Sequence, residues 1–426
     1  MAIPTLTMIP SGYKAGKLYS VLPTNGDGDF TTSRSTTANR VNKSGLIETM
    51  ASGISRLNYP LVNGVVGDCP SLLLERSSTN LQLRSEEFEN SLYFKNSVVV
   101  VSNATVSPNG DVSSDKITRT STSAGNILSI ISKSTSAIEY TSSIFVKQGE
   151  GDYLTIQLQG NYGDRIDIRF RFSTKEFYET TEFGSAILRS TKVEEYPNGW
   201  LRLSYSYLSD TASSVRNYYS PRSSNGNISS TNPTSTSFVY LWGAMVEENT
   251  YPTSYIPTTT SSVTRLNDFI DGAGSNSLFN SLESTFFVEM ASFLNQQTSS
   301  NGIELSDISG QNRITLQYDT TNNQIRCDVR VLNSAQAILA TTNFDITNFN
   351  KMAITYKLNE VKFYVNGQLR GTDTSVNLFA PNTLTEVRST IAAISNVNFN
   401  LQAKIKDLRV YNTVLTQEEA IALTTL

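Results

Sequence analysis

The sequence contains no histidine and only two cysteines among its 426 residues. Without histidine the chain cannot form a Ser-His-Asp or Cys-His nucleophile, nor a histidine-ligated zinc or iron site. Cys69 and Cys327 are too few for a thiolate zinc site or a disulfide framework. Glycine-rich phosphate-binding motifs are also absent, so the sequence predicts no metal and no cofactor.

The sequence also lacks a large excess of charge of one sign and any long apolar run. The 34 Lys and Arg against 38 Asp and Glu give a formal net charge of −4, which offers no reason to expect binding to nucleic acid or anionic membrane. No apolar run approaches about 18 residues, so no membrane insertion is predicted.

The first ten residues lack a basic start and contain two prolines. They predict no signal peptide, and we expect synthesis in a cytosol.

The dominant pattern in the sequence is a period-2 alternation of apolar and polar residues, which is typical of strands with one wet face. In residues 164–172 the apolar positions are Ile166, Ile168, Phe170 and Phe172. A similar alternation at 361–365 is followed by Asn366-Gly367, a pair that favours a type I′ hairpin turn. The sequence therefore predicts an all-β fold built from antiparallel sandwiches.

Turn signals and composition divide the chain into four parts. Residues 1–90 are rich in turn signals and predict a loop-rich docking segment, and residues 91–257 predict a first β-sandwich, like a carbohydrate-binding module. Residues 258–270 predict a linker or crossover, and residues 271–426 a second β-sandwich in series. One short C-terminal helix is predicted from Thr416, because Thr416 and Glu419 have the spacing of a capping box.

The C-terminal part resembles the concanavalin A-like, laminin-G-type jelly rolls. The stretches that carry this resemblance are 350–356 (NKMAITY), 360–369 (EVKFYVNGQL), 405–412 (IKDLRVYN) and 415–419 (LTQEE). The resemblance implies a jelly-roll fold for about residues 270–426. It leaves the ligand open, because this sandwich serves lectins, glycosidases and passive spacers alike.

A second resemblance, to bacteriophage appendage proteins, covers most of residues 27–265. Its stretches are 27–31 (DGDFT), 33–42 (SRSTTANRVN), 45–48 (GLIE), 69–75 (CPSLLLE), 79–81 (TNL), 85–88 (SEEF), 199–203 (GWLRL), 240–247 (YLWGAMVE) and 251–258 (YPTSYIPT). It implies a virion protein such as a head fibre, a tail fibre or a capsid decoration, assembled in the host cytoplasm. The implied partners are other virion proteins and further copies of the chain, as a trimer or dimer.

Exposed aromatic side chains are the candidates for contact with a glycan or a partner protein. Tyr218 and Tyr219 stand in a Ser- and Asn-rich stretch between Asp210 and Pro233, where no strand pattern buries them, so we predict that they lie on a loop. Trp200 and Trp242 occur within or next to strand patterns, and for these we predict core packing.

Acidic residues offer neither a catalytic pair nor a calcium loop. Glu304 and Asp307 have odd spacing, which directs their side chains to opposite faces of a strand, and the same holds for adjacent carboxylates such as Glu194 and Glu195. The stretch 25–29 lacks the glycine and glutamate of an EF-hand loop and predicts a tight turn. For the two cysteines we expect buried thiols and no disulfide.

Taken together, the sequence predicts a structural protein of the virion that attaches to host-surface or mucosal glycans through many weak sites. No catalytic residue is predicted. Two alternatives remain open: a virion-associated polysaccharide depolymerase, and a spacer or cement protein that binds no glycan.

Overall fold

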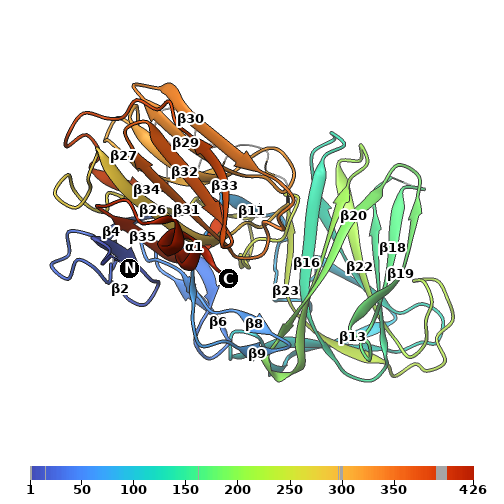
Figure 1. Cartoon of the computed structure of the whole chain (residues 1–426). Helices are drawn as coiled ribbons and strands as arrows, with labels where there is room; N and C mark the ends of the chain where they lie inside the picture. Colours follow the sequence, from blue (N-terminus) through green and yellow to red (C-terminus); the bar gives the residue numbers. More distant parts are fainter. Residues whose placement is uncertain (1, 15, 162, 296, 298–300, 390–400) are drawn as a thin grey trace.

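The computed structural model describes residues 2–14, 16–161, 163–295, 297, 301–389 and 401–426. Two β-sandwiches lie side by side, and the N-terminal segment runs beneath both of them (Figure 1). One short α-helix, α1 (Gln417–Thr424), follows the last strand. The predicted all-β class is confirmed.

The middle sandwich is formed by two six-stranded antiparallel sheets. The first sheet has the order β12 (Tyr93–Asn96), β15 (Asn126–Ser132), β22 (Ser214–Arg222), β17 (Tyr153–Gln159), β18 (Arg165–Arg171) and β19 (Glu176–Phe183). The second has the order β13 (Val98–Val106), β14 (Val112–Arg119), β23 (Phe238–Glu247), β16 (Glu139–Gln148), β21 (Trp200–Leu208) and β20 (Ile187–Tyr196), and a 3-10 turn, η1 (Pro197–Gly199), links β20 to β21.

The alternation predicted for β18 places its apolar side chains in the core between these two sheets. Ile166, Ile168 and Phe170 are fully buried, and Phe172, just after the strand, is 6% exposed. On the other face Arg165, Arg169 and Arg171 are half-buried, but Asp167 is only 2% exposed. The wet face predicted from the sequence is therefore only partly solvated.

The C-terminal sandwich packs a large sheet against a five-stranded sheet. The large sheet has the order β33 (Gln368–Asp373), β32 (Glu360–Val365), β31 (Asn350–Lys357), β26 (Glu283–Ala291), β35 (Ala403–Tyr411), β10 (Ser71–Leu74) and β7 (Leu57–Asn58), with β1 (Leu6–Met8) also paired to β35. The smaller sheet has the order β30 (Ser334–Thr341), β29 (Ile325–Val331), β28 (Arg313–Tyr318), β27 (Asn301–Ser306) and β34 (Glu386–Arg388).

The N-terminal segment is built into the C-terminal sandwich. β1 and β10 pair with successive parts of β35, so Leu6, Met8, Leu72 and Leu74 lie in the same core as the strands after residue 283. These leucines and the methionine are at most 1% exposed. The first 90 residues therefore contribute strands and core side chains and are not only loops.

Small sheets fasten the rest of the N-terminal segment and the crossover. β25 (Phe269–Asp271) closes a four-stranded sheet with β2 (Tyr13–Lys14), β3 (Lys17–Leu18) and β4 (Phe30–Ser33). The remaining pairs are β5 (Ala38–Val41) with β6 (Ile47–Met50), β8 (Leu61–Val62) with β9 (Val65–Val66), and β11 (Ser78–Asn80) with β24 (Val263–Arg265). Residues 258–270 thus return the chain along the N-terminal segment.

Two local predictions in the C-terminal part are confirmed. Asn366 and Gly367 both have positive φ angles, 48° and 75°, in the tight turn between β32 and β33. The Thr416 hydroxyl accepts the Glu419 amide while the Glu419 carboxylate accepts the Thr416 amide, which is the predicted capping box. α1 packs its Ala420 and Leu423 against the outer face of the large sheet.

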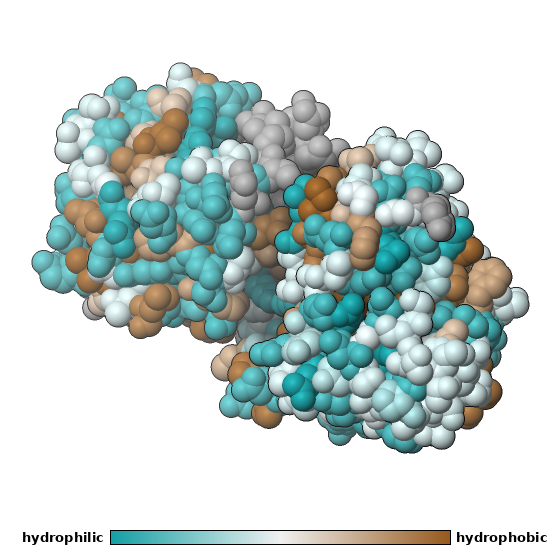
Figure 2. All heavy atoms as spheres, turned by 90° about the vertical axis from the view of Figure 1, so that its right-hand side faces the viewer, coloured by the Kyte–Doolittle hydropathy of each residue, from teal (hydrophilic) through white to brown (hydrophobic). Residues whose placement is uncertain are grey.

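The surface of the molecule is largely hydrophilic on the face shown in Figure 2, with hydrophobic residues in small groups. Within the described residues, no helix has the length and apolar character that crossing a membrane requires.

Candidate functional site

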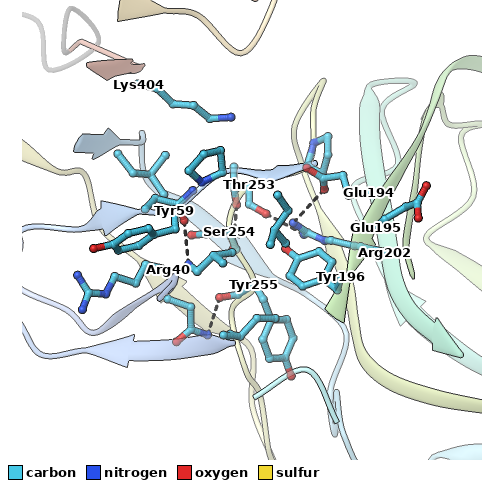
Figure 3. Close-up of a pocket in the computed structure, with 18 of the residues that line it drawn as sticks. Arg40, Tyr59, Glu194, Glu195, Tyr196, Arg202, Thr253, Ser254, Tyr255 and Lys404 are labelled. Atoms are coloured by element: carbon cyan, nitrogen blue, oxygen red, sulfur yellow. Dashed lines mark hydrogen bonds and ion pairs between the residues drawn. The ribbon is translucent and has the colours of Figure 1, made fainter. Parts of the chain in front are cut away.

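A cleft of about 520 Å³ lies where the N-terminal segment, the middle sandwich and the C-terminal sandwich meet (Figure 3). The N-terminal segment supplies β5, residues 58–63 and the end of β10, and the middle sandwich supplies β20 and Arg202 of β21. Residues 252–255 form another wall, and the C-terminal sandwich contributes Phe293 and Lys404.

The floor of the cleft is an apolar layer on the outer face of the second sheet of the middle sandwich. The β5–β6 hairpin covers this face with Val41 and Ile47, which pack in one cluster with Tyr196 and Tyr255. All four side chains are at most 9% exposed. This layer fixes the N-terminal segment on the middle sandwich, so the cleft has a rigid base.

Beneath one wall lies a buried ionic network centred on Glu75. The Glu75 carboxylate accepts hydrogen bonds from the Ser254 amide and hydroxyl, at 2.8 and 2.7 Å, and from Arg56 at 2.7 Å. Arg265 lies 3.6 Å from the same carboxylate, and Arg56 also pairs with Asp268. Burial would raise the pKa of Glu75, but Arg265 and Arg56 outweigh it and lower the pKa to about 2.

The opposite wall carries a second set of charges around Glu194. Arg202 donates to the Thr253 carbonyl at 2.7 Å and lies 3.9 Å from Glu194, and Lys192 lies 2.8 Å from the other Glu194 oxygen. Burial opposes ionisation of Glu194, but Lys192 and Arg202 lower its pKa to about 2. Glu195 turns away from the cleft and pairs with Lys175 (Figure 3).

Two aromatic rings remain half-buried in the cleft, Tyr59 and Phe293. The Phe293 ring is stacked on Tyr251, with centroids 5.3 Å apart and planes 7° apart, which holds its orientation. Lys404 of β35 points across the cleft from the C-terminal sandwich (Figure 3). The cleft therefore combines ring faces with charged, amide and hydroxyl groups.

The carboxylates of the cleft are poor candidates for acid catalysis. Hydrolysis of a glycosidic bond needs one carboxylic acid that is protonated near neutral pH. Glu75 and Glu194, with pKa values of about 2, are ionised there. Within the described residues, no cluster of three or more acidic or cysteine side chains could hold a metal ion.

The predicted loop position of Tyr218 and Tyr219 is wrong, because both residues lie in β22. Tyr219 is 1% exposed in the core, while Tyr218 is half-buried on the outer face and donates to Gln159 at 3.1 Å. The strand escaped prediction because Asn217 interrupts the inward series Val215, Asn217, Tyr219 with a fully buried polar residue. A contact role for Tyr218 stays a prediction, and both tyrosines lie outside the cleft.

The core packing predicted for the two tryptophans is confirmed. Trp200 and Trp242 are each 1% exposed, and the Trp200 indole donates to the Val106 carbonyl at 3.0 Å. They belong to the apolar layer under the cleft, between the middle sandwich and the N-terminal segment.

The structure places the acidic residues for which the sequence predicted neither a catalytic pair nor a calcium loop. Glu304 lies on the face of β27 that points away from the core, paired with Arg388 at 2.6 Å, whereas Asp307 lies beyond the strand and accepts from Ser309 and Asn312. In the stretch 25–29 a tight turn is closed by the Asp29 amide, which donates to the Gly26 carbonyl at 3.1 Å.

The prediction of two buried thiols is confirmed for Cys327 and wrong for Cys69. Cys327 is fully buried in β29, and burial raises the pKa of its thiol. Cys69 is exposed because it lies in the surface connection between β9 and β10. Neither thiol forms a disulfide.

Sequence reasoning missed the cleft because its residues come from five stretches far apart in the chain. The spacing between Tyr59, Arg202, Phe293 and Lys404 carries no motif. The sequence did hold one signal for the cleft. Three of the stretches that resemble bacteriophage appendage proteins, 33–42, 69–75 and 251–258, meet around Glu75.

Comparison with known proteins bears on the C-terminal wall of the cleft. Residues 285–421 match the family model described as the concanavalin A-like lectin/glucanases superfamily. No curated protein matches the chain.

Similar solved structures align with about a third to two fifths of the chain. The CBM40 module of the Ruminococcus gnavus IT-sialidase, bound to alpha2,3-sialyllactose, is 15% identical, with 34% of this chain and 83% of that chain covered and a TM-score of 0.28. The SAP-like pentraxin of Limulus polyphemus is 12% identical, with 34% and 71% covered and a TM-score of 0.29. Domain 4 of AbnA, a GH43 extracellular arabinanase of Geobacillus stearothermophilus, in complex with arabinotriose, is 13% identical, with 42% and 84% covered and a TM-score of 0.29. Residues 285–421, which include Phe293 and Lys404 of the cleft, form a concanavalin A-like, laminin-G-type domain.

Proposed function

We propose that this protein binds glycans in the cleft between its two sandwiches. The observation that carries the proposal is the pair of half-buried rings, Tyr59 and Phe293, beside polar groups of residues 252–255 and β20. A sugar can lay its C–H face on such a ring and direct its hydroxyls to the polar groups. The volume of about 520 Å³ falls within the range of ligand pockets, roughly 300–1,000 Å³. The match of residues 285–421 to a superfamily of lectins and glucanases supports the same function.

Glycan-array screening of the full chain, followed by calorimetry on the best glycan, tests this proposal. We expect Tyr59→Ala and Phe293→Ala each to weaken binding by about tenfold, since each removes a stacking surface worth roughly 1.4 kcal/mol. Tyr59→Phe should retain binding. Tyr178→Ala is the matched control, because Tyr178 is 53% exposed on β19 and lies outside the cleft. Full binding by both alanine variants, with unfolding midpoints like that of the wild type, would overturn the proposal.

We further propose that the chain is a bacteriophage virion protein, a head fibre, tail fibre or capsid decoration, which assembles in the host cytoplasm as a trimer or dimer. The resemblance of residues 27–265 to appendage proteins supports this part. Many copies on one particle would raise the avidity of a weak site by orders of magnitude. Mass spectrometry of purified virions should find the chain in stoichiometric amounts, and its absence from particles would refute the assignment.

Binding is preferred over depolymerisation because Glu75 and Glu194 are held ionised by neighbouring cations. Incubation with host capsule should therefore release no shortened oligosaccharides. Release of such fragments would favour the depolymerase, and an array without any bound glycan would favour the spacer.

A further inference from the structure

The charges that line the cleft are balanced, with one exception. Lining charges other than Lys404 have an oppositely charged partner at 2.5–3.9 Å; the pairs are Arg40–Glu48, Arg56–Glu75, Lys175–Glu195, Lys192–Glu194 and Arg202–Glu194. Within the described part of the chain, the Lys404 ammonium has neither an ion-pair partner nor a hydrogen-bond acceptor. Its contact is with the Phe293 ring, whose centroid lies 5.8 Å away.

The position of Lys404 in the fold makes this lack of a partner significant. Lys404 lies in β35, paired with Leu73 on one side and Ala291 on the other, so its backbone is fixed in the middle of the large sheet. Its side chain is half-buried and directed into the cleft (Figure 3). Burial and the nearby Lys192 lower the pKa of Lys404, and Glu194 and Glu75, which lie beyond ion-pair distance, offset this only in part. An ammonium group that has lost part of its hydration without gaining an acceptor is destabilised, and an anion in the cleft would relieve this cost.

The neighbours of Lys404 define what kind of anion fits. The Phe293 ring lies beside the ammonium and is held by its stacking on Tyr251, and Tyr59 lines the same cleft. A ligand that uses both features carries a negative group next to an apolar ring face. A small inorganic anion would leave the rings uncovered, and a neutral sugar would offer Lys404 hydroxyl acceptors but no counter-charge.

We propose that the cleft selects acidic glycans and that Lys404 binds their negatively charged group while Phe293 contacts the sugar ring. This inference rests on the proposed glycan-binding function and adds the class of sugar. The negative group is a carboxylate, or a sulfate or phosphate ester, and these groups share the chemistry that an ammonium recognises.

The test compares charged and neutral forms of the same sugar on the full-length protein. Hexagalacturonate and its methyl ester differ in charge while keeping the ring, and sulfated and unsulfated lactose provide the ester arm. We expect about tenfold tighter binding of at least one charged form, the difference that a charge-assisted hydrogen bond supplies. Lys404→Ala should abolish this preference, whereas Lys404→Arg should keep it.

Lys406→Ala is the matched control for charge. Lys406 is two residues away on β35, where it lies over the Phe349 ring and 4.0 Å from Glu289, outside the cleft. Equal binding of charged and neutral sugars, or a preference that survives Lys404→Ala, would overturn the inference while leaving glycan binding intact. Failure of every sugar to bind would instead overturn the proposed function as well.

Discussion

Glu75 joins segments of the chain that lie far apart in the sequence. Its carboxylate holds Arg56 of the N-terminal segment, Ser254 at the cleft and Arg265 of the crossover. Because Glu75, Arg56 and Arg265 are almost fully removed from water, each charge depends on its partners for compensation. The network therefore determines how residues 34–75 and 254–268 fit together under the cleft.

At the scale of a single residue, we expect Glu75→Gln to lower the free energy of unfolding by about 3 kcal/mol at pH 7, because buried guanidinium groups lose a counter-charge. Folding lowers the pKa of Glu75 from 4.5 to about 2, so its stabilisation is complete above pH 4.5 and is lost as the pH falls from 4.5 towards 2. The variant should thus lose less stability than the wild type between pH 7 and pH 3. Urea unfolding followed by the fluorescence of Trp200 and Trp242 measures both effects.

Glu48→Gln serves as the control for this prediction. Glu48 is 42% exposed in its pair with Arg40, and pairs of that kind contribute less than about 1 kcal/mol. An identical loss of stability on acidification in the wild type and in Glu75→Gln would show that Glu75 does not carry the effect.

At the scale of elements, local signals in the sequence were sufficient for some strands and turns. The alternation in β18, the Asn366-Gly367 turn and the Thr416 capping box each specify their structure through neighbouring residues. β22 was missed because a buried Asn217 breaks its apolar series. The cleft was missed for a different reason: its walls are assembled by pairing between distant strands, which one sequence does not reveal.

The capping box gives a prediction for α1. Thr416→Ala removes the hydroxyl that accepts the Glu419 amide, and we expect a loss of about 1 kcal/mol in helix stability. Hydrogen exchange read by mass spectrometry should show faster exchange in residues 417–424. Gln417→Ala, an exposed change on the same helix, should leave exchange unchanged. Equal exchange in both variants would contradict a capping role.

At the scale of the whole molecule, the two sandwiches depend on the N-terminal segment. It supplies Leu6, Met8, Leu72 and Leu74 to the core of the C-terminal sandwich, and the β5–β6 hairpin covers Trp200 and Trp242 of the middle one. Burial of four such side chains contributes on the order of 8 kcal/mol, which is comparable with the stability of a typical domain.

We therefore expect residues 271–426, expressed alone, not to fold cooperatively. Far-UV circular dichroism with urea should show no sharp transition for this fragment, and a cooperative one for the full chain. Adding residues 1–90 as a separate polypeptide should restore a transition. A cooperative transition of the fragment by itself would show that the N-terminal strands are dispensable.

The pairing of β1 with β35 also sets the timing of folding during synthesis. About 400 residues separate these strands, so a ribosome working at roughly 5–20 residues per second completes β35 some 20–80 s after β1. Through that interval Leu6 and Met8 have no sheet to join, while the middle sandwich, whose strands are contiguous in the chain, can already assemble. The core around β1 is therefore completed only once β35 has been synthesised.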